Sequence, residues 1–447
     1  MAFCLFLAVT ARAGNNPIVL TQRQVVEISA QLIVKGEFDD ATTLLTRQSF
    51  DVLELEIERL YLLGRIAAKE ERYRDAIKIW RHILDHQPGL SKIRLELALA
   101  YMAMNQWYRA DYHMRLAASD PDLPLSVQME VRRYLFIIRQ NKNWNIWVNL
   151  GMAPDNNVNN AVGGEECITY SPTFGYFPYP LCRKLSEPER AMGYNFGIGG
   201  DYEFRFGQQW RLKNDFAVQA NFYDKSQYNM YFLSASSGPR YVFPRGDVWL
   251  AATGHKMYYG GDDFRNSLGL KLDANYDFTR RLSGNLLLNY SAMDYYGDMA
   301  NYMDGAVYGA GLRFVYNLDA SKFLVFRTGV DRENTKEDAY SNWRHNYAVG
   351  FGAEIPFGFR VYVEPSVAWT NFDGGRWTVA ETQHGSEYIQ VVERQFTQRY
   401  MASLSNNRFT LYGFTPVINY SYTNRESNIN SRSFSKHAIG FTVQQRF

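Results

Sequence analysis

Long apolar runs are absent from this sequence. No stretch of roughly 18 or more consecutive apolar residues occurs, which excludes an α-helix that crosses a lipid bilayer. A membrane β-barrel is not excluded, because its strands alternate apolar and polar residues and average to an unremarkable hydropathy. An excess of charge of one sign is also absent, with 48 Lys+Arg against 46 Asp+Glu. This balance argues against nucleic acid as a partner, since nucleic-acid binders usually carry a basic surface.

Cysteine is scarce, with 3 residues, and one of them lies in an N-terminal segment with the pattern of a signal peptide. An apolar stretch over residues 1–9 precedes Ala11-Arg12-Ala13, which predicts a signal peptide, residues 1–13, cleaved after Ala13. The basic segment that usually opens such a peptide is missing, so we expect the peptide to be N-terminally shortened. Cleavage removes one of the 3 cysteines and leaves Cys167 and Cys182. In an exported protein, such a pair predicts a disulfide rather than a metal site.

Catalytic and cofactor-binding motifs are absent as well. The sequence contains no Gly-x-Ser-x-Gly turn, no P-loop and no Gly-x-Gly-x-x-Gly segment before a helix, the usual signs of a hydrolase or a nucleotide site. His82 and His86 are spaced to share one helix face, but no third metal ligand accompanies them. We therefore expect no enzymatic activity, no cofactor and no metal. The alternative is a barrel enzyme with a catalytic triad in its lumen or at its rim.

Aromatic residues, by contrast, are abundant, with 32 Tyr, 29 Phe and 9 Trp. Transmembrane barrels place such residues in girdles at both membrane interfaces. The chain divides near residue 140. Before this point the sequence pattern is typical of helices, and after it the pattern is typical of strands. We predict a helical domain over residues 17–140 and a β-barrel over residues 141–447.

The helical part shows self-similarity at a period of about 34 residues, which is typical of the tetratricopeptide repeat. Apolar residues recur at helical spacing over residues 66–84 and 95–118. Small residues and one tryptophan occupy equivalent positions where two helices must approach closely. The expected packing residues are Gly64, Ala76, Trp80, Pro88, Ala98, Tyr101 and Ala110. A weaker unit precedes these two, and residues 125–140 are expected to form a capping helix. Such an array either binds a partner in its groove or serves as a spacer or plug for the barrel.

The second part alternates with a period of two. In residues 267–278, Leu268, Leu270 and Leu272 share one strand face, and polar residues occupy the other. Ten or more alternating residues suit a tilted strand that crosses a bilayer. We predict fourteen antiparallel strands, at about 143–153, 191–205, 209–223, 228–242, 247–259, 265–278, 282–294, 304–317, 321–333, 343–356, 358–371, 391–405, 408–422 and 434–447.

The connections alternate between short turns and longer loops, which indicates periplasmic turns and extracellular loops of an outer-membrane barrel. This parity places the helical domain in the periplasm. Phe441, Val443 and Phe447 share one face of the last strand and resemble the C-terminal signal of proteins inserted by the barrel-assembly machinery. If the apolar face meets lipid, seven charged residues are expected to face the lumen, where they pair with one another or contact a passing chain: Arg211, Lys213, Asp215, Lys271, Asp273, Asp277 and Arg399.

The junction between the two parts resembles the first barrel segment of the surface lipoprotein assembly modulator family. It is carried by a motif rich in Asp and Asn that comprises Trp144, Gly151, Pro154, Asp155, Asn157, Asn159 and Ala161. From the residues alone, the motif predicts a turn in which these side chains bond their own backbone. The resemblance implies a monomeric translocator in the outer membrane, with a tetratricopeptide-type domain and a barrel of fourteen strands.

The same resemblance implies a periplasmic protein as cargo, either a surface lipoprotein or a secreted protein that binds haem or a metalloprotein. The large loop with Cys167 and Cys182 departs from the family pattern. Two alternatives remain from the sequence: an exopolysaccharide exporter with tetratricopeptide repeats, or a general porin, which would leave the helical domain unexplained. Outer-membrane lipid and the barrel-assembly machinery are the other expected partners.

Overall fold

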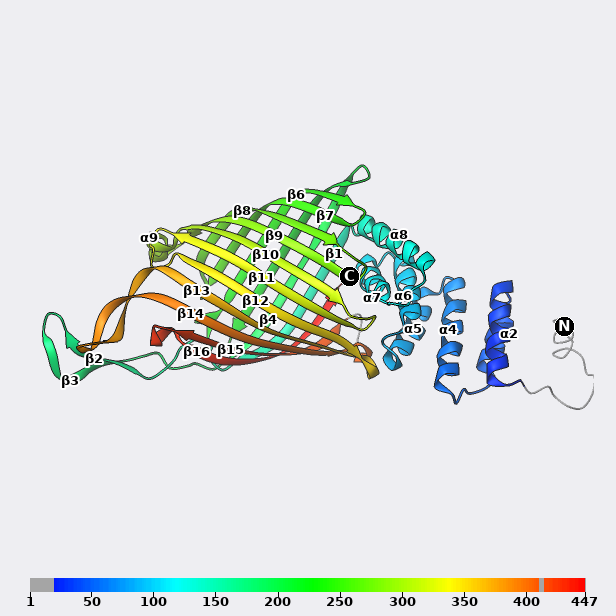
Figure 1. Ribbon diagram of the computed structural model, residues 1–447, viewed down its shortest axis with the longest axis horizontal. Helices are drawn as coiled ribbons and strands as arrows, with labels where there is room; N and C mark the ends of the chain where they lie inside the picture. The colour runs from blue at the N-terminus through cyan, green and yellow to red at the C-terminus, as the bar shows by residue number, and fades with distance from the viewer. Residues whose placement is uncertain (1–19, 410–413, 447) are drawn as a thin grey trace, which may run out of the picture.

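The computed structural model describes residues 20–409 and 414–446 (Figure 1). The predicted signal peptide and Phe447 lie outside these ranges. A row of helices precedes a closed antiparallel barrel, so the predicted fold class is confirmed. A second sheet of two strands projects from the barrel end that is remote from the helices. We call the two barrel ends the helical end and the far end.

Three helical hairpins and a last helix make up the N-terminal domain among the described residues. Thr21 and Gln24 form a capping box at the first described helix, and Gly36 ends it in the left-handed conformation. None of the helices described is both long and apolar enough to cross a membrane. The helices are α2 (Gln22–Lys35), α3 (Phe38–Thr46), α4 (Leu53–Lys69), α5 (Tyr73–His86), α6 (Ser91–Ala103), α7 (Trp107–Ala118) and α8 (Leu125–Asn141).

One continuous apolar core runs through the helical domain, from Val25 in α2 to Ile138 in α8. Trp80 is fully buried against Gly64, where an added Cβ would lie 2.3 Å from the indole nitrogen. Ala76, Ala98 and Ala110 are likewise fully buried at the helix contacts. Tyr101 is buried too, and Pro88 is half-buried in the connection after α5. The spacing of small and large residues thus sets the close approach of the helices.

Fourteen of the described strands close the barrel in chain order, and β1 pairs with both β4 and β16. They are β1 (Trp144–Asp155), β4 (Ala191–Phe206), β5 (Trp210–Tyr223), β6 (Met230–Phe243), β7 (Gly246–Tyr259), β8 (Asp262–Asp277), β9 (Leu282–Tyr295), β10 (Gly305–Asn317), β11 (Lys322–Thr335), β12 (Asn342–Ile355), β13 (Phe359–Thr382), β14 (Gly385–Asn406), β15 (Thr415–Ser427) and β16 (Phe434–Arg446). Each pairs antiparallel with its neighbours.

Apolar side chains point outward from the barrel. On β8, Leu268 and Leu270 are 71% and 55% exposed, whereas Lys271 on the other face bonds inside the barrel to Ser236. Near the helical end, outward-facing rings contact one another from strand to strand, as an aromatic girdle does at a membrane interface. We call this set the helical-end girdle; it comprises Trp210, Tyr241, Phe243, Tyr276, Phe278 and Phe314.

Two strands are longer than the sequence predicts. β13 and β14 extend to 24 and 22 residues and project beyond the far end of the barrel (Figure 1). The predicted strands stop at residue 371 and resume at 391, because Gly374 and Gly375 suggest a break. The structure instead has a register shift between Asn371 and Gly375, after which the pairing continues. A β-bulge therefore replaces the expected end of the strand. β15 also begins later than predicted, at Thr415 rather than residue 408.

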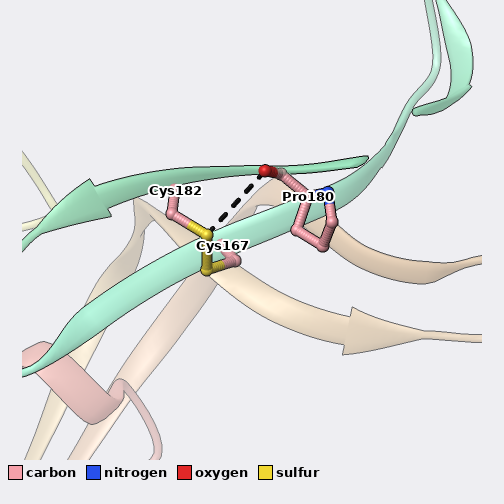
Figure 2. Close-up of a disulfide and its surroundings, with 3 residues drawn as sticks. All are labelled: Cys167, Pro180 and Cys182. Carbon is pink, nitrogen blue, oxygen red and sulfur yellow. Dashed lines mark hydrogen bonds between the residues drawn. A yellow bond between two sulfur atoms is a disulfide. The ribbon is translucent and has the colours of Figure 1, made fainter. Parts of the chain in front are cut away.

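The long loop after β1 contains a hairpin that the sequence analysis did not predict. Its strands are β2 (Glu165–Ser171) and β3 (Gly175–Lys184), and β2 lies beside the projecting β13–β14 hairpin. Cys167 and Cys182 face each other across β2 and β3 and form a disulfide (Figure 2). The sulfur of Cys182 lies 3.9 Å from the carbonyl oxygen of Pro180. The bond staples a loop that has little apolar core of its own.

Candidate functional site at the helical end of the barrel

Helix α7 lies across the helical end of the barrel. Tyr108, Tyr112 and Arg115 are spaced four and three residues apart and therefore share one face of this helix. Their partners lie on three separate parts of the barrel wall. Tyr108 donates to Asp201 of β4 at 3.0 Å, Tyr112 to Glu354 of β12 at 2.5 Å, and Arg115 to Asp277 of β8 at 2.7 Å. One helix face thus bridges three sides of the opening.

Glu354 is the centre of the first ion network. It accepts hydrogen bonds from Arg94 of α6 at 2.6 Å, from Arg360 of β13 at 2.7 Å and from Tyr112. The side chains of Arg94 and Glu354 are 0% and 10% exposed. Arg94 also donates to the carbonyl oxygen of Pro88 at 2.7 Å. Removal of one partner from such a buried pair leaves the other charge unpaired, which costs about 3–5 kcal/mol.

Asp277 is the centre of the second network. Arg115 of α7 and Arg139 of α8 both bond its carboxylate. Arg139 further donates to the carbonyl oxygens of Phe243 and Pro244, at the turn between β6 and β7. This network therefore fixes the last helix, which leads directly into β1, against a part of the barrel rim that lies several strands away from Glu354.

Asp111 joins the two helices within this region. It accepts from Arg115 at 3.1 Å and from Lys142 at 2.7 Å. Burial acts to raise the pKa of Asp111, but the charges of Arg115 and Lys142 outweigh burial and hold it well below its usual range. The carboxylate therefore stays ionised and continues to hold α7 to the end of α8.

His113 lies beside Arg94 of the Glu354 network. Its ring stacks on Tyr101 with the centroids 5.5 Å apart, and its Nδ1 lies 3.5 Å from Arg94. Burial, followed by the charge of Arg94, lowers the pKa of His113 well below its ordinary value. The imidazole is therefore neutral in the folded protein at neutral pH.

A cavity of about 920 Å³ lies between α5, α7, α8 and the strand ends of the barrel. Its lining includes charged residues of both signs, among them Arg81, Lys142, Arg240, Arg313 and Glu203. The helical domain therefore occupies the opening without filling it. A space lined in this way tolerates water and can bond the peptide groups of an extended chain.

The seven predicted lumen residues fall into two groups. Within the barrel, Lys271 donates to Ser236 at 2.8 Å and lies 3.5 Å from Asp215. Lys213 and Lys271 lie 4.5 Å and 4.2 Å from the ring of the buried Trp249, and this tryptophan was not singled out from the sequence. Asp273 accepts from Asn285 at 2.6 Å, and Arg399 is exposed on the inward face of β14.

The other two of the seven lie at the helical end. Asp277 bonds the helical domain, as described above. Arg211 is buried at the β4–β5 turn, where it donates to the carbonyl oxygens of Trp210 and Gln208 and to that of Gln140 in α8. These two residues therefore connect the barrel wall to the helices rather than line the middle of the lumen.

The junction motif lies where the first and last strands meet. Asn157 donates to the carbonyl oxygens of Ala161 and Ser435, and Asp155 pairs with Lys436 at 3.2 Å. We call these bonds the far-end clasp, because they tie β1 to β16 at the far end. A Cβ on Gly151 would lie 2.4 Å from Thr442, so only glycine fits there without a shift of this side chain.

The remaining motif residues have separate surroundings. Asn159 bonds the backbone of Glu187 and Glu189, the bulky outward ring of Trp144 is exposed, and Pro154 carries no N–H for the ladder. At the C-terminus, Phe441 faces outward and Val443 pairs with Leu150 on the same face of the sheet.

Within the described residues, side chains of the kinds that bind metals lie close together at one place. That group consists of Glu165 and the bonded Cys167 and Cys182, and a disulfide offers no thiolate to a metal. His82 and His86 contact each other edge to face, with their ring centroids 5.0 Å apart.

Apart from Asp277 and Arg211, the residues that join the two domains are not predicted by the sequence. Arg94 and Glu354 are far apart in the sequence, and neither belongs to a motif. A signal was present in α7, since two tyrosines and an arginine at a spacing of four and three put a polar stripe on one helix face. That stripe indicates a contact, although it does not identify the partner.

Comparison with known proteins identifies the family. Residues 144–447 match the sequence profile of the surface lipoprotein assembly modifiers. A surface lipoprotein assembly modifier of Pasteurella multocida is 21% identical over 86% of this chain and 75% of its own length. Surface lipoprotein assembly modifier 1 of Haemophilus influenzae is 20% identical over 84% of this chain and 74% of its own length.

Among solved structures, a FadL homologue of Pseudomonas aeruginosa aligns with a TM-score of 0.37 and 8% identity, over 76% of this chain and 93% of that chain. The family match covers the whole barrel, including the junction motif. Most strand connections are short at the helical end and longer at the far end, which in an outer-membrane barrel places the helical end in the periplasm. This chain belongs to the surface lipoprotein assembly modifier family and is a barrel of the bacterial outer membrane.

Proposed function

We propose that this chain carries a specific lipoprotein from the periplasm to the cell surface. The observation that supports this function is the position of α7 across the barrel opening, held at Asp201, Asp277 and Glu354. A passive porin has no use for a domain fixed in its periplasmic mouth. The helical domain receives the cargo, and its displacement opens the lumen to a polar chain.

The lipid anchor of such a cargo cannot follow the same polar route at low cost. Each buried CH₂ that moves into water costs about 0.8 kcal/mol, so we propose that the anchor leaves sideways into the bilayer. The contact between β1 and β16 suits this exit. β1 pairs with β4 without interruption from Trp144 to Asp155, whereas among the described residues its pairing with β16 is interrupted between Met152 and Asp155. We call this contact the seam.

Further parts of the proposal concern partners and chemistry. We propose that one copy suffices and that the barrel-assembly machinery inserts it through the outward face of β16, which includes Phe441 and Val443. The cargo is a lipoprotein of the surface-exposed kind, and the alternative is a secreted protein that binds haem or a metalloprotein. Transport involves no covalent step and needs no cofactor, and cargo folding outside the cell supplies the driving force.

The test is co-expression with a lipoprotein encoded beside this chain, in a host that lacks both, followed by protease treatment of intact cells. We expect the lipoprotein to be cleaved only when this chain is present. Equal cleavage without the chain would contradict the proposed function.

Two crosslinks test whether the lipid anchor leaves at the seam or elsewhere in the barrel wall. Leu150→Cys with Val443→Cys joins neighbours across the seam, and Leu272→Cys with Leu288→Cys joins neighbours of β8 and β9. Paired residues on adjacent strands lie within disulfide range. We expect the seam crosslink alone to block surface display, and a reductant to restore it. Equal display with both crosslinks would exclude the lateral exit while leaving the transport function intact.

A further inference from the structure

A second cavity, of about 320 Å³, lies outside the lumen, between α8 and the turns that follow β6 and β8. Its walls are mainly apolar, with Val131, Leu135 and Phe136 from α8, and Pro244 and Phe278 from the barrel. An apolar pocket of this kind favours a hydrocarbon chain over water. It shares Arg115 and Asp277 with the contact between α7 and the barrel, and its other lining residues take no part in that contact.

Arginines surround this pocket. Arg132 and Arg133 belong to α8, Arg245 to the β6–β7 turn and Arg280 to the β8–β9 turn. The first three are exposed, and within residues 20–409 and 414–446 no carboxylate pairs with them. Asp277 is the one acid among the described lining residues, and Arg115 and Arg139 already bond it. The rim therefore carries an uncompensated positive charge above an apolar pocket.

The pocket opens at the membrane boundary. Phe278 in its wall belongs to the helical-end girdle, which marks the level where the bilayer meets the periplasm. Leu125 and Met129 extend from the same exposed side of α8 as Arg132 and Arg133, and they are 71% and 65% exposed. Apolar and basic residues together on one helix face are typical of a helix that lies on a membrane surface. Figure 1 shows α8 against the rim of the barrel.

We propose that this pocket binds an anionic phospholipid of the periplasmic leaflet. The arginines bond the phosphate, since a guanidinium presents paired donors to phosphate oxygens. One acyl chain enters the apolar pocket, and the other stays in the leaflet. The acylated cysteine of a lipoprotein carries no phosphate, so the charge of the rim favours membrane lipid over the cargo anchor. The bound lipid fixes α8, and with it the helical domain, to the membrane surface.

The experiment is native mass spectrometry of the full chain in neutral detergent, titrated separately with phosphatidylglycerol, phosphatidylcholine, inorganic phosphate and a triacylated lipopeptide. We expect phosphatidylglycerol to bind best. The triple variant Arg132→Gln/Arg133→Gln/Arg245→Gln should bind it about 100-fold more weakly, at about fivefold per arginine. The matched control is Arg23→Gln/Arg47→Gln/Arg74→Gln, which removes the same charge from exposed positions of the helical domain.

Three outcomes would overturn the proposal: an equal loss of affinity in the control, equal binding of phosphatidylcholine, or preferential binding of the lipopeptide. Displacement of the lipid by millimolar inorganic phosphate would show an anion site without the acyl chain and would also contradict it. If the triple variant fails to fold, the single substitution Arg245→Gln in the β6–β7 turn gives the same test. We expect it to bind phosphatidylglycerol about fivefold more weakly. The proposal depends on the membrane location alone, so it survives a failure of the transport test.

Discussion

The two domains of this chain bury their apolar residues in opposite directions. The helical domain collects them in one continuous core, whereas the barrel turns Leu268, Leu270 and their equivalents outward and keeps Lys271 and Asp273 inside. The first is therefore stabilised by removal of apolar surface from water. The second is stabilised by closure of its backbone hydrogen bonds in lipid.

This contrast explains why the contact between the domains is polar. The helical end of the barrel carries Asp201, Asp277 and Glu354. Tyr108, Arg115 and Arg94 of the helical domain bond these three residues. An apolar contact would have to be exposed to water each time the domains separate. Paired charges can be hydrated again on separation, which suits the opening proposed above.

The largest predicted effect concerns the buried network at Glu354. Glu354→Gln removes the charge that pairs with Arg94 and Arg360. We expect the contact between α7 and the barrel to weaken by about 3–5 kcal/mol, because the fully buried guanidinium of Arg94 loses its partner. Hydrogen exchange of α7 amides in nanodiscs measures the change.

The matched control for Glu354 is Asp85→Asn, which breaks the more exposed pair with Arg408 between the same two domains. An exposed pair contributes less than about 1 kcal/mol, so α7 should stay protected. Equal loss of protection in both variants would mean that the Glu354 network does not hold the domains together.

The next effect tests the orientation of the barrel face. Leu287 and Leu288 are adjacent on β9; Leu288 pairs with the outward Leu272, and Leu287 pairs with the inward Asp273. Leu288→Arg should reduce the free energy of unfolding in lipid vesicles by about 2–4 kcal/mol, since it puts a charge into lipid. Leu287→Arg places the same charge in the polar lumen beside Asp273 and should change it by less than about 1 kcal/mol. Guanidinium titration measures both, and equal losses would contradict the assignment of the two faces.

A smaller effect tests the packed core of the helical domain. In Gly64→Ala, the new Cβ would lie 2.3 Å from the indole of Trp80, so the helices must move apart. We expect a loss of about 1–2 kcal/mol, because overpacking outweighs the gain in helix propensity. Gly89→Ala is the control, since a Cβ there meets nothing within 4 Å. Thermal unfolding followed by circular dichroism compares the two, and similar midpoints would argue against close packing at Gly64.

The smallest effect is a dependence on pH. The pKa of His113 is lowered in the folded protein by burial and by Arg94, so the unfolded chain binds its proton at a higher pH. The stability from the neutral ring is therefore complete above the unfolded pKa of about 6.5 and declines below it, by up to about 1.4 kcal/mol per pH unit. Unfolding of the helical domain at pH 7 and pH 5.5 measures this decline. His113→Gln should reduce it, and an unchanged slope would contradict the assignment.

Much of the fold follows from the sequence, because alternation and turn residues act locally. The predicted strand count agrees with the structure, and most strand ends differ by only a few residues. The errors arise where local signals mislead. Gly374 and Gly375 suggest a turn but form a bulge. The β2–β3 hairpin depends on its disulfide and on its position beside β14. Neither β2 nor β3 shows a clear alternation of apolar and polar residues in the sequence.

The site was much harder to predict than the fold. Arg94 and Glu354 meet only because the helical domain folds back onto the barrel, and no periodic pattern records that contact. The predicted lumen residues were chosen by strand face, which is a local property. Strand face does not distinguish the middle of the lumen from its end, and for this reason Asp277 and Arg211 were grouped with Lys271.

The far-end clasp has a consequence for the order of events during folding. Asp155 and Lys436 stand near the two ends of the barrel sequence, so their contact, like the β1–β16 pairing beside it, closes a loop that contains almost all of the barrel strands. Loop closure of this kind is slow, because the entropy of the whole intervening chain must be lost before the contact forms. The clasp therefore forms last, after the other strands have paired in sequence. Until then, the unpaired edges of β1 and β16 remain accessible, and the nascent barrel is open to any assembly factor that pairs with a free strand.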